Sequence, residues 1–167
     1  MHTNEFPRSF SEELLTREQK AELLEKTPVA KEMDWRELQT LAGYFAGYRV
    51  GSGTVIFNQD DPGHFMGVIC QGRVDIIKRD YSYAEKVIAS LGPGNTIGEM
   101  ALIDGEPRSA VVVAHSSLLI LILTQERFDE LADTHPRLWG KLILRLSRIL
   151  SKRLRLTSGV LAEYLQD

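Results

Sequence analysis

The chain has 167 residues, a net charge of −3 and a single cysteine, Cys70. This length suits one domain, or one domain with helical extensions, and it can bury a core without disulfides. The charge gives no overall attraction to nucleic acid, and the longest apolar run, residues 118–123, is too short to cross a bilayer. We therefore expect a cytoplasmic, soluble protein that does not associate with a membrane.

The first 48 residues have the composition of helices. Leucine and alanine recur among Glu, Gln, Lys and Arg between residues 14 and 24. Thr16 with Gln19, and Asp34 with Glu37, fit capping boxes at the starts of two helices. Because Pro28 separates these two stretches, we assign residues 1–28 to an N-terminal helical extension and residues 29–167 to the main domain.

Residues 49–123 have the pattern of short strands separated by turns. The predicted strands are 54–57, 65–70, 73–78, 85–91, 110–114 and 118–123, with turn residues such as Asp61-Pro62-Gly63 between them. Many short strands at this spacing indicate an antiparallel sandwich or barrel. From Thr124 the pattern becomes helical again, and a long helix begins near Pro136. Helices, a small β barrel and further helices together predict an α+β domain.

The segment from Ile97 to Ala110 interrupts the strands and carries the chemistry. A short helical turn over 99–103 is predicted to bury Met100, Leu102 and Ile103. Gly98 lets a ligand approach the backbone, and the start of the turn offers free N–H groups to an anion. Arg108 carries a planar set of donors that matches phosphate oxygens. Glu99 would repel a phosphate unless it accepts a hydrogen bond from a neighbouring hydroxyl, such as that of a ribose.

The same segment resembles the phosphate-binding cassette of the cyclic-nucleotide-binding domain family. The matching residues are Gly98, Glu99, Met100, Ala101, Leu102, Pro107, Arg108, Ser109 and Ala110. Weaker similarity extends over about residues 29–160, although Ile97 and Asn95 stand where Phe and Asp are commoner in the family. The resemblance implies an eight-stranded antiparallel jelly-roll barrel, flanked by N-terminal helices and a long C-terminal helix.

The resemblance also implies a role for each site residue. Glu99 would accept a hydrogen bond from the ribose 2′-hydroxyl, and Arg108 would pair with the cyclic phosphate. Ser109 and Ala110 would donate amide N–H groups to phosphate oxygens, while Gly98 and Met100 would line the sugar. The candidates for the apolar wall around the base are Ile76, Ile88 and Ile97.

The C-terminal helix has more apolar surface than one face against a barrel needs. Its basic residues form a stripe, and its leucines and isoleucines fill much of the remainder. The excess predicts a homodimer through this helix, with a monomer that folds the helix over its own barrel as the alternative. Because charge stripes are usually solvated faces, nucleic-acid binding is not expected. The segment from Arg153 to Ser158 resembles the end of the corresponding helix in bacterial transcription regulators. By that resemblance Thr157 would reach the base, with Ser158 as the weaker candidate.

The predicted function is therefore a regulatory module that senses cyclic AMP, or less favourably cyclic GMP, and moves its C-terminal helix. Two other classes compete with it. An enzyme on a jelly roll, such as a metal-dependent cupin, would need clustered histidines, whereas the four histidines here are scattered. A non-binding structural copy would not need both Glu99 and Arg108. We expect no catalytic residue, no metal and no cofactor.

Overall fold

The computed structural model describes residues 9–79, 82 and 84–165. Its first elements are β1 (Phe10–Glu13), α1 (Arg17–Glu25), the 3₁₀ helix η1 (Pro28–Ala30), α2 (Trp35–Ala42), β2 (Ala46–Val50), β3 (Val55–Phe57), β4 (Phe65–Gln71) and β5 (Val74–Arg79). The remainder are β6 (Glu85–Leu91), β7 (Thr96–Ile97), α3 (Glu99–Asp104), β8 (Val111–Ala114), β9 (Leu118–Thr124), α4 (Gln125–Thr134) and α5 (Pro136–Tyr164). This order confirms the predicted α+β fold with a long C-terminal helix.

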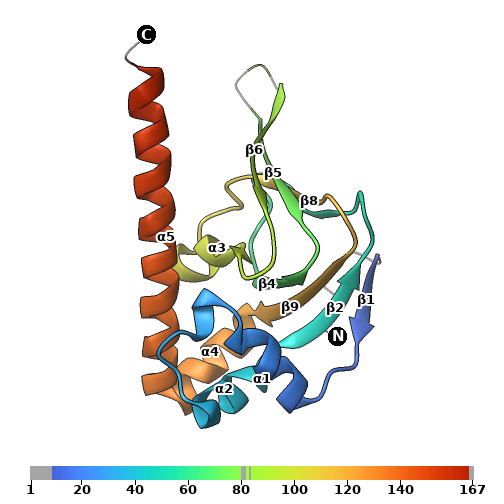
Figure 1. The fold of residues 1–167 in the computed structure, drawn as a ribbon, viewed down its shortest axis with the longest axis vertical. Helices are drawn as coiled ribbons and strands as arrows, with labels where there is room; N and C mark the ends of the chain where they lie inside the picture. Colours follow the sequence, from blue (N-terminus) through green and yellow to red (C-terminus); the bar gives the residue numbers. More distant parts are fainter. Residues whose placement is uncertain (1–8, 80–81, 83, 166–167) are drawn as a thin grey trace.

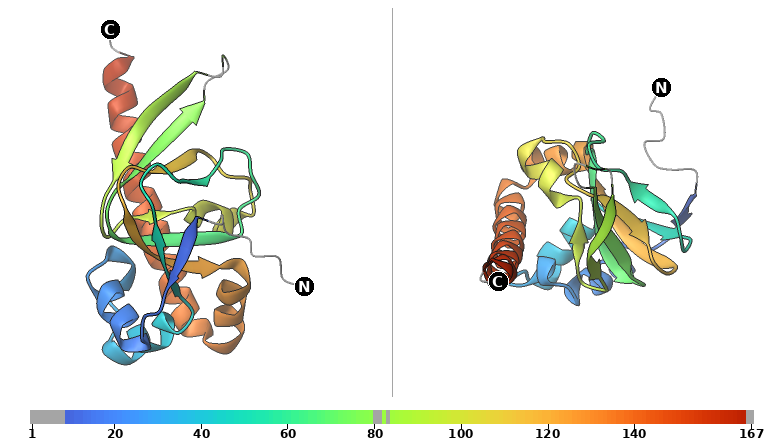
Figure 2. Two further views of the ribbon diagram at one scale, coloured as in Figure 1. Left: turned by 90° about the vertical axis from the view of Figure 1, so that its right-hand side faces the viewer. Right: turned by 90° about the horizontal axis from the view of Figure 1, so that it is seen from above.

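Two antiparallel sheets form the β region (Figures 1 and 2). One has the strand order β1-β2-β9-β4-β7 and the other the order β3-β8-β5-β6. Two strands, β1 and β2, lie in the region that we predicted to be helical, so that prediction was wrong there. The reason is tertiary pairing, because Ala46 to Val50 pair along β9 and Phe10 to Glu13 pair along β2.

Strand β9 explains the unbroken apolar run at residues 118–123. Leu118, Ile120 and Ile122 belong to the core between the two sheets. Leu121 and Leu123 point to the opposite face and pack into the core under the helices. Since alternate side chains of a strand face opposite sides, a strand with a core on both faces has no polar position.

The N-terminal helices begin where the sequence predicts. Thr16 with Gln19 and Asp34 with Glu37 form reciprocal capping boxes at α1 and α2. Two residues of α1, Ala21 and Leu24, are fully buried in the core that also contains Leu121. The domain boundary at residue 28 stays a prediction.

Helix α5 runs along one side of the molecule (Figure 1). Its basic stripe is not simply a solvated face, which corrects the sequence-based expectation. Lys141 pairs with Glu37, Arg148 pairs with Glu32, and Arg145 donates to the Pro28 carbonyl at 3.1 Å. The stripe therefore attaches α5 to η1 and α2. Within the described residues, no helix has the length and apolar character needed to span a membrane.

Candidate functional site

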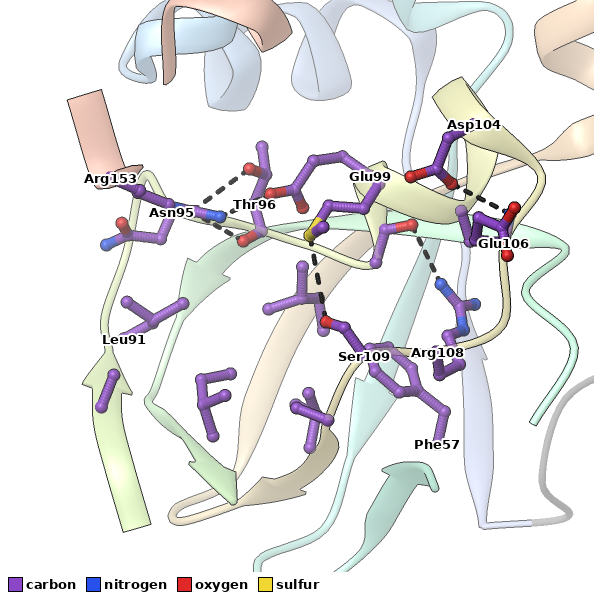
Figure 3. Close-up of a pocket in the computed structure, with 18 of the residues that line it drawn as sticks. Phe57, Leu91, Asn95, Thr96, Glu99, Asp104, Glu106, Arg108, Ser109 and Arg153 are labelled. Carbon is purple, nitrogen blue, oxygen red and sulfur yellow. Dashed lines mark hydrogen bonds and ion pairs between the residues drawn. The ribbon is translucent and has the colours of Figure 1, made fainter. Parts of the chain in front are cut away.

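A cavity of about 500 Å³ lies between the α3 segment, the strands of the smaller sheet and the C-terminal half of α5 (Figure 3). Its strand-derived lining is apolar and includes Ile76, Ala89 and Leu91. Its polar lining comes from residues 95–109 and from Arg153 and Thr157 of α5. An apolar wall opposite a few polar groups is the usual composition of a small-molecule site.

Gly98 makes the sharp entry into α3 possible. Its φ of 72° lies in the left-handed region, where a side chain is strained. A Cβ at this position would also lie 2.4 Å from Nη1 of Arg108 and 3.0 Å from the Phe65 carbonyl oxygen. Helix α3 forms as predicted, and Leu102 is buried. Met100 and Ile103 are respectively 45% and 40% exposed, so the predicted burial of those two residues was wrong.

Glu99 is the buried carboxylate of the site, with a relative exposure of 2%. Its Oε1 accepts a hydrogen bond from Arg153 Nη1 of α5 at 2.5 Å. Arg153 Nη2 also donates to the Thr96 carbonyl oxygen at 2.9 Å. The second carboxylate oxygen, Oε2, is buried and has no hydrogen-bond partner. Because an unsatisfied buried acceptor is costly, Oε2 is the atom of the site best prepared to accept a donor from a ligand.

Arg108 is held by hydrogen bonds to backbone carbonyl groups around the α3 segment. Nη1 donates to the Gly98 carbonyl at 2.9 Å and Nη2 donates to the Phe65 carbonyl at 2.8 Å. The guanidinium carbon lies 4.1 Å from the Phe57 ring centroid and 4.6 Å from that of Phe65. Burial lowers the pKa of Arg108 to about 10, although Glu99 and Asp61 oppose the shift. These two bonds use two of the five N–H groups of the guanidinium, and Nε is buried without a hydrogen-bond partner. Donors therefore remain for phosphate oxygens while both carbonyl contacts are kept.

The structure brings the predicted site residues together, with one exception. The residues that line the cavity are Ile76, Ile97, Gly98, Glu99, Met100, Arg108, Ser109, Ala110 and Thr157. Ile88 is 58% exposed and is not among the described lining residues. Its neighbour Ala89 lines the cavity, and Ile88 is the residue left without a strand partner where the register of β5 and β6 shifts. The roles assigned to these residues stay predictions.

Sequence reasoning missed Arg153 as a site residue. The motif from Arg153 to Ser158 indicated a role at the base for Thr157, with Ser158 as the weaker candidate, and none for Arg153. Ser158 is not among the described residues that line the cavity. The spacing was the available signal, because residues four apart on a helix share a face. Arg153 and Thr157 do both line the cavity, as does Leu156 between them. A role for Arg153 at Glu99 could not be read from one sequence, since 54 positions separate the two residues.

Comparison with known proteins identifies the family. The family model described as the cyclic nucleotide-binding domain matches residues 49–135. The chain belongs to the cyclic nucleotide-binding domain family. The matched range contains the whole segment from Gly98 to Ala110, with the cavity-facing strands, and it ends just before α5. Membership confirms the resemblance found in the sequence.

Similar proteins use this domain in different settings. The chain is 31% identical over 119 residues to the cyclic AMP receptor protein of Thermus thermophilus, which covers 71% of this chain and 53% of that relative. It is 37% identical over 89 residues to a cyclic nucleotide-gated potassium channel of Rhizobium etli, covering 53% and 23% of the two chains. The chain thus spans about half of the first relative and about a quarter of the second.

A solved structure is also similar over most of its length. The cyclic nucleotide-binding domain from Methylobacillus flagellatus superposes with a TM-score of 0.81 and 27% sequence identity. The match covers 90% of this chain and 86% of that one. The structural similarity therefore extends beyond residues 49–135, which the family model matches.

Proposed function

We propose that the chain binds a cyclic nucleotide, cyclic AMP, in the cavity beside α3, and that occupancy changes the position of α5. One observation carries the proposal. Glu99 is buried with one oxygen held by Arg153 of α5, while its other oxygen is unpartnered. A ligand that donates to Oε2 would contact the carboxylate that also holds the helix, so ligand and helix would share one residue.

A ribose hydroxyl suits Glu99 better than a charged group does. A hydroxyl donates a proton without adding a negative charge beside the carboxylate. Arg108 lies below the same segment and supplies the positive charge that a cyclic phosphate requires. The two residues would then orient the ligand, because Glu99 accepts a hydrogen bond from the sugar and Arg108 attracts the phosphate.

Thr157 favours adenine over guanine. Its hydroxyl donates to the Arg153 carbonyl at 3.0 Å, so what it offers to the cavity is an acceptor. The adenine amino group is a donor, and guanine has a carbonyl at that position. Cyclic GMP is the alternative ligand, since the Ser109 hydroxyl lines the same cavity and could contact the guanine amino group over the sugar.

Calorimetry with cyclic AMP, cyclic GMP and 2′-deoxy cyclic AMP tests the proposal. A hydrogen bond to a charged group contributes about 1.5–3 kcal/mol, so we expect the wild type to prefer the ribonucleotide over the deoxy form by about 10- to 100-fold. Glu99→Ala should bring this ratio close to one. A wild type that prefers cyclic GMP would overturn the base assignment. An unchanged ratio in Glu99→Ala would overturn the ribose contact.

We further propose a homodimer through the distal part of α5, coupled to nucleotide binding. Leu142 and Leu146 are fully buried in the chain's own core, so they are unavailable to a partner helix. Beyond Arg153, the exposed large apolar residues are Leu154, Leu156, Val160, Leu161 and Tyr164 of α5, with Leu165 directly after it. A parallel copy of the helix would cover such a surface.

Sedimentation of the chain with and without cyclic AMP tests the dimer. A monomer at tens of micromolar in both conditions would rule it out. We expect Leu161→Ser to weaken the dimer, and the matched change Leu144→Ser, outside this segment, to leave it intact. Hydrogen exchange at the end of α5 that does not respond to nucleotide would remove the coupling.

A further inference from the structure

Lys78, near the end of β5, contacts the segment that the proposed phosphate site uses. Its ammonium donates to the backbone carbonyl of Ser109. The contact follows from strand pairing, because Ile77 of β5 lies opposite Val111 of β8, and residues 109–110 lead directly into β8 (Figure 1). The register therefore brings the end of β5 beside the end of the cassette.

We propose that Lys78 is a positioning residue for the bound phosphate, an inference that rests on the proposed function. The Ser109 carbonyl and the Ala110 N–H belong to the same peptide group. A cationic donor on the carbonyl polarises this group and strengthens the N–H as a donor. Ala110 is buried and lines the cavity, so its peptide is held at the cavity wall.

Arg153 and the acidic side chains at the cavity do not supply the positive charge that this role requires. Arg153 is paired with Glu99, and two further carboxylates, those of Asp104 and Glu106, line the same cavity. Within the described residues, the ion pairs include none made by Lys78. Its positive charge offsets the acidic lining at the end of the cassette where a phosphate would meet the backbone.

Isothermal titration with cyclic AMP and with adenosine separates this role from a structural one. Lys78→Met should weaken cyclic AMP about 3- to 10-fold at low ionic strength, and the loss should shrink as salt is raised. Adenosine carries no phosphate, so its affinity should change less than twofold. Lys78→Arg keeps the charge and should stay within about twofold of the wild type for both ligands.

Lys86→Met is the matched control. Lys86 lies opposite Lys78 on β6, and β6 pairs with β5 but not with β8. Lys86→Met removes the same charge from the same hairpin. It should leave the affinities for cyclic AMP and for adenosine within about twofold of the wild type. An equal loss for cyclic AMP and adenosine in Lys78→Met would show a structural role and overturn the proposal, as would no loss relative to Lys86→Met.

A second readout reports on the peptide itself. On binding of cyclic AMP, the amide proton of Ala110 should move downfield in the wild type and move less in Lys78→Met. An identical shift in both proteins would overturn the polarisation step. A wild type that binds no cyclic nucleotide at all would reject the proposed function instead, which keeps the two failures distinct.

Discussion

The two halves of α5 are held in different ways. In the half from Pro136 to Ile149, Leu138, Leu142 and Leu146 are buried in the helical core, and three basic residues attach the helix to η1 and α2. In the half from Leu150 to Tyr164, the large apolar side chains at 154, 156, 160 and 161 are all more than half exposed. Arg153, bound to Glu99 and Thr96, is the principal polar anchor of this distal half.

The cavity lies beside the distal half of α5, which is the more weakly held of the two halves. A segment with little buried apolar area opens at low free-energy cost, while a segment packed into the core opens only with the whole domain. A ligand in the cavity would add contacts to the distal half alone. Under the proposed function, the distal end of the helix would respond to the nucleotide while the proximal end fixes the direction of the helix.

Removing core packing from the proximal half should have the largest effect. Leu146→Ala deletes a fully buried side chain and should lower the free energy of unfolding by about 2–5 kcal/mol. Leu161→Ala on the same helix removes a side chain that is 57% exposed and should change stability by less than about 0.5 kcal/mol. Urea unfolding of the two variants measures both values. Similar losses would contradict the division of the helix into two halves.

Removing the distal anchor should have an intermediate effect. Arg153→Met leaves the buried Glu99 carboxylate without its partner, which costs about 1–3 kcal/mol. Hydrogen exchange should speed up at residues 151–164 and stay unchanged at residues 138–146. Lys152→Met, next to it on the exposed face, is the control and should leave both segments unaffected. Protection lost along the entire helix would show that Arg153 supports more than the distal half.

The ion pairs of the proximal half should contribute less to the free energy of unfolding. Glu32 is 59% exposed and pairs with Arg145 and Arg148, so Glu32→Gln should cost no more than about 1 kcal/mol. The loss should disappear in 1 M salt, because exposed pairs are screened. Thermal unfolding at low and high salt measures this difference. A salt-independent loss would indicate that the side chain acts through packing.

Cys70, which packs against the core under the proximal half, is a chemical probe of the same division. Burial raises the pKa of its thiol to about 11 from 9.0. At pH 8 the thiolate fraction is then lower by about 100-fold, and alkylation should be slow to the same degree. Alkylation should accelerate in Leu146→Ala and remain slow in Arg153→Met. Fast alkylation in Arg153→Met would show that the two halves open together.

The sequence predicted most where local signals are strong. Capping boxes and the run from Gly98 to Ala110 each fix a local conformation, and the family resemblance added the barrel. The turn predicted at Asp61-Pro62-Gly63 forms earlier, at residues 59–60. Prediction from the sequence failed where contacts between distant elements determine the structure. Residues 46–50 pair with β9 although they have no clear alternation, and Ile88 is exposed at a register shift between β5 and β6. The Arg153–Glu99 contact joins two elements whose relative placement no local pattern encodes.

The close packing of Gly63 and Gly98 against Arg108 restricts which residues evolution can accept at these positions. A Cβ at Gly63 would lie 2.3 Å from the Ala101 Cβ and 3.1 Å from the Arg108 guanidinium carbon. A Cβ at Gly98 would meet Nη1 of the same arginine at 2.4 Å. Positions 63 and 98 should therefore remain glycine among natural homologues. Replacing the arginine alone would not admit a side chain at either position, because a Cβ at 63 would still meet Ala101 and the backbone at 98 would keep its left-handed φ.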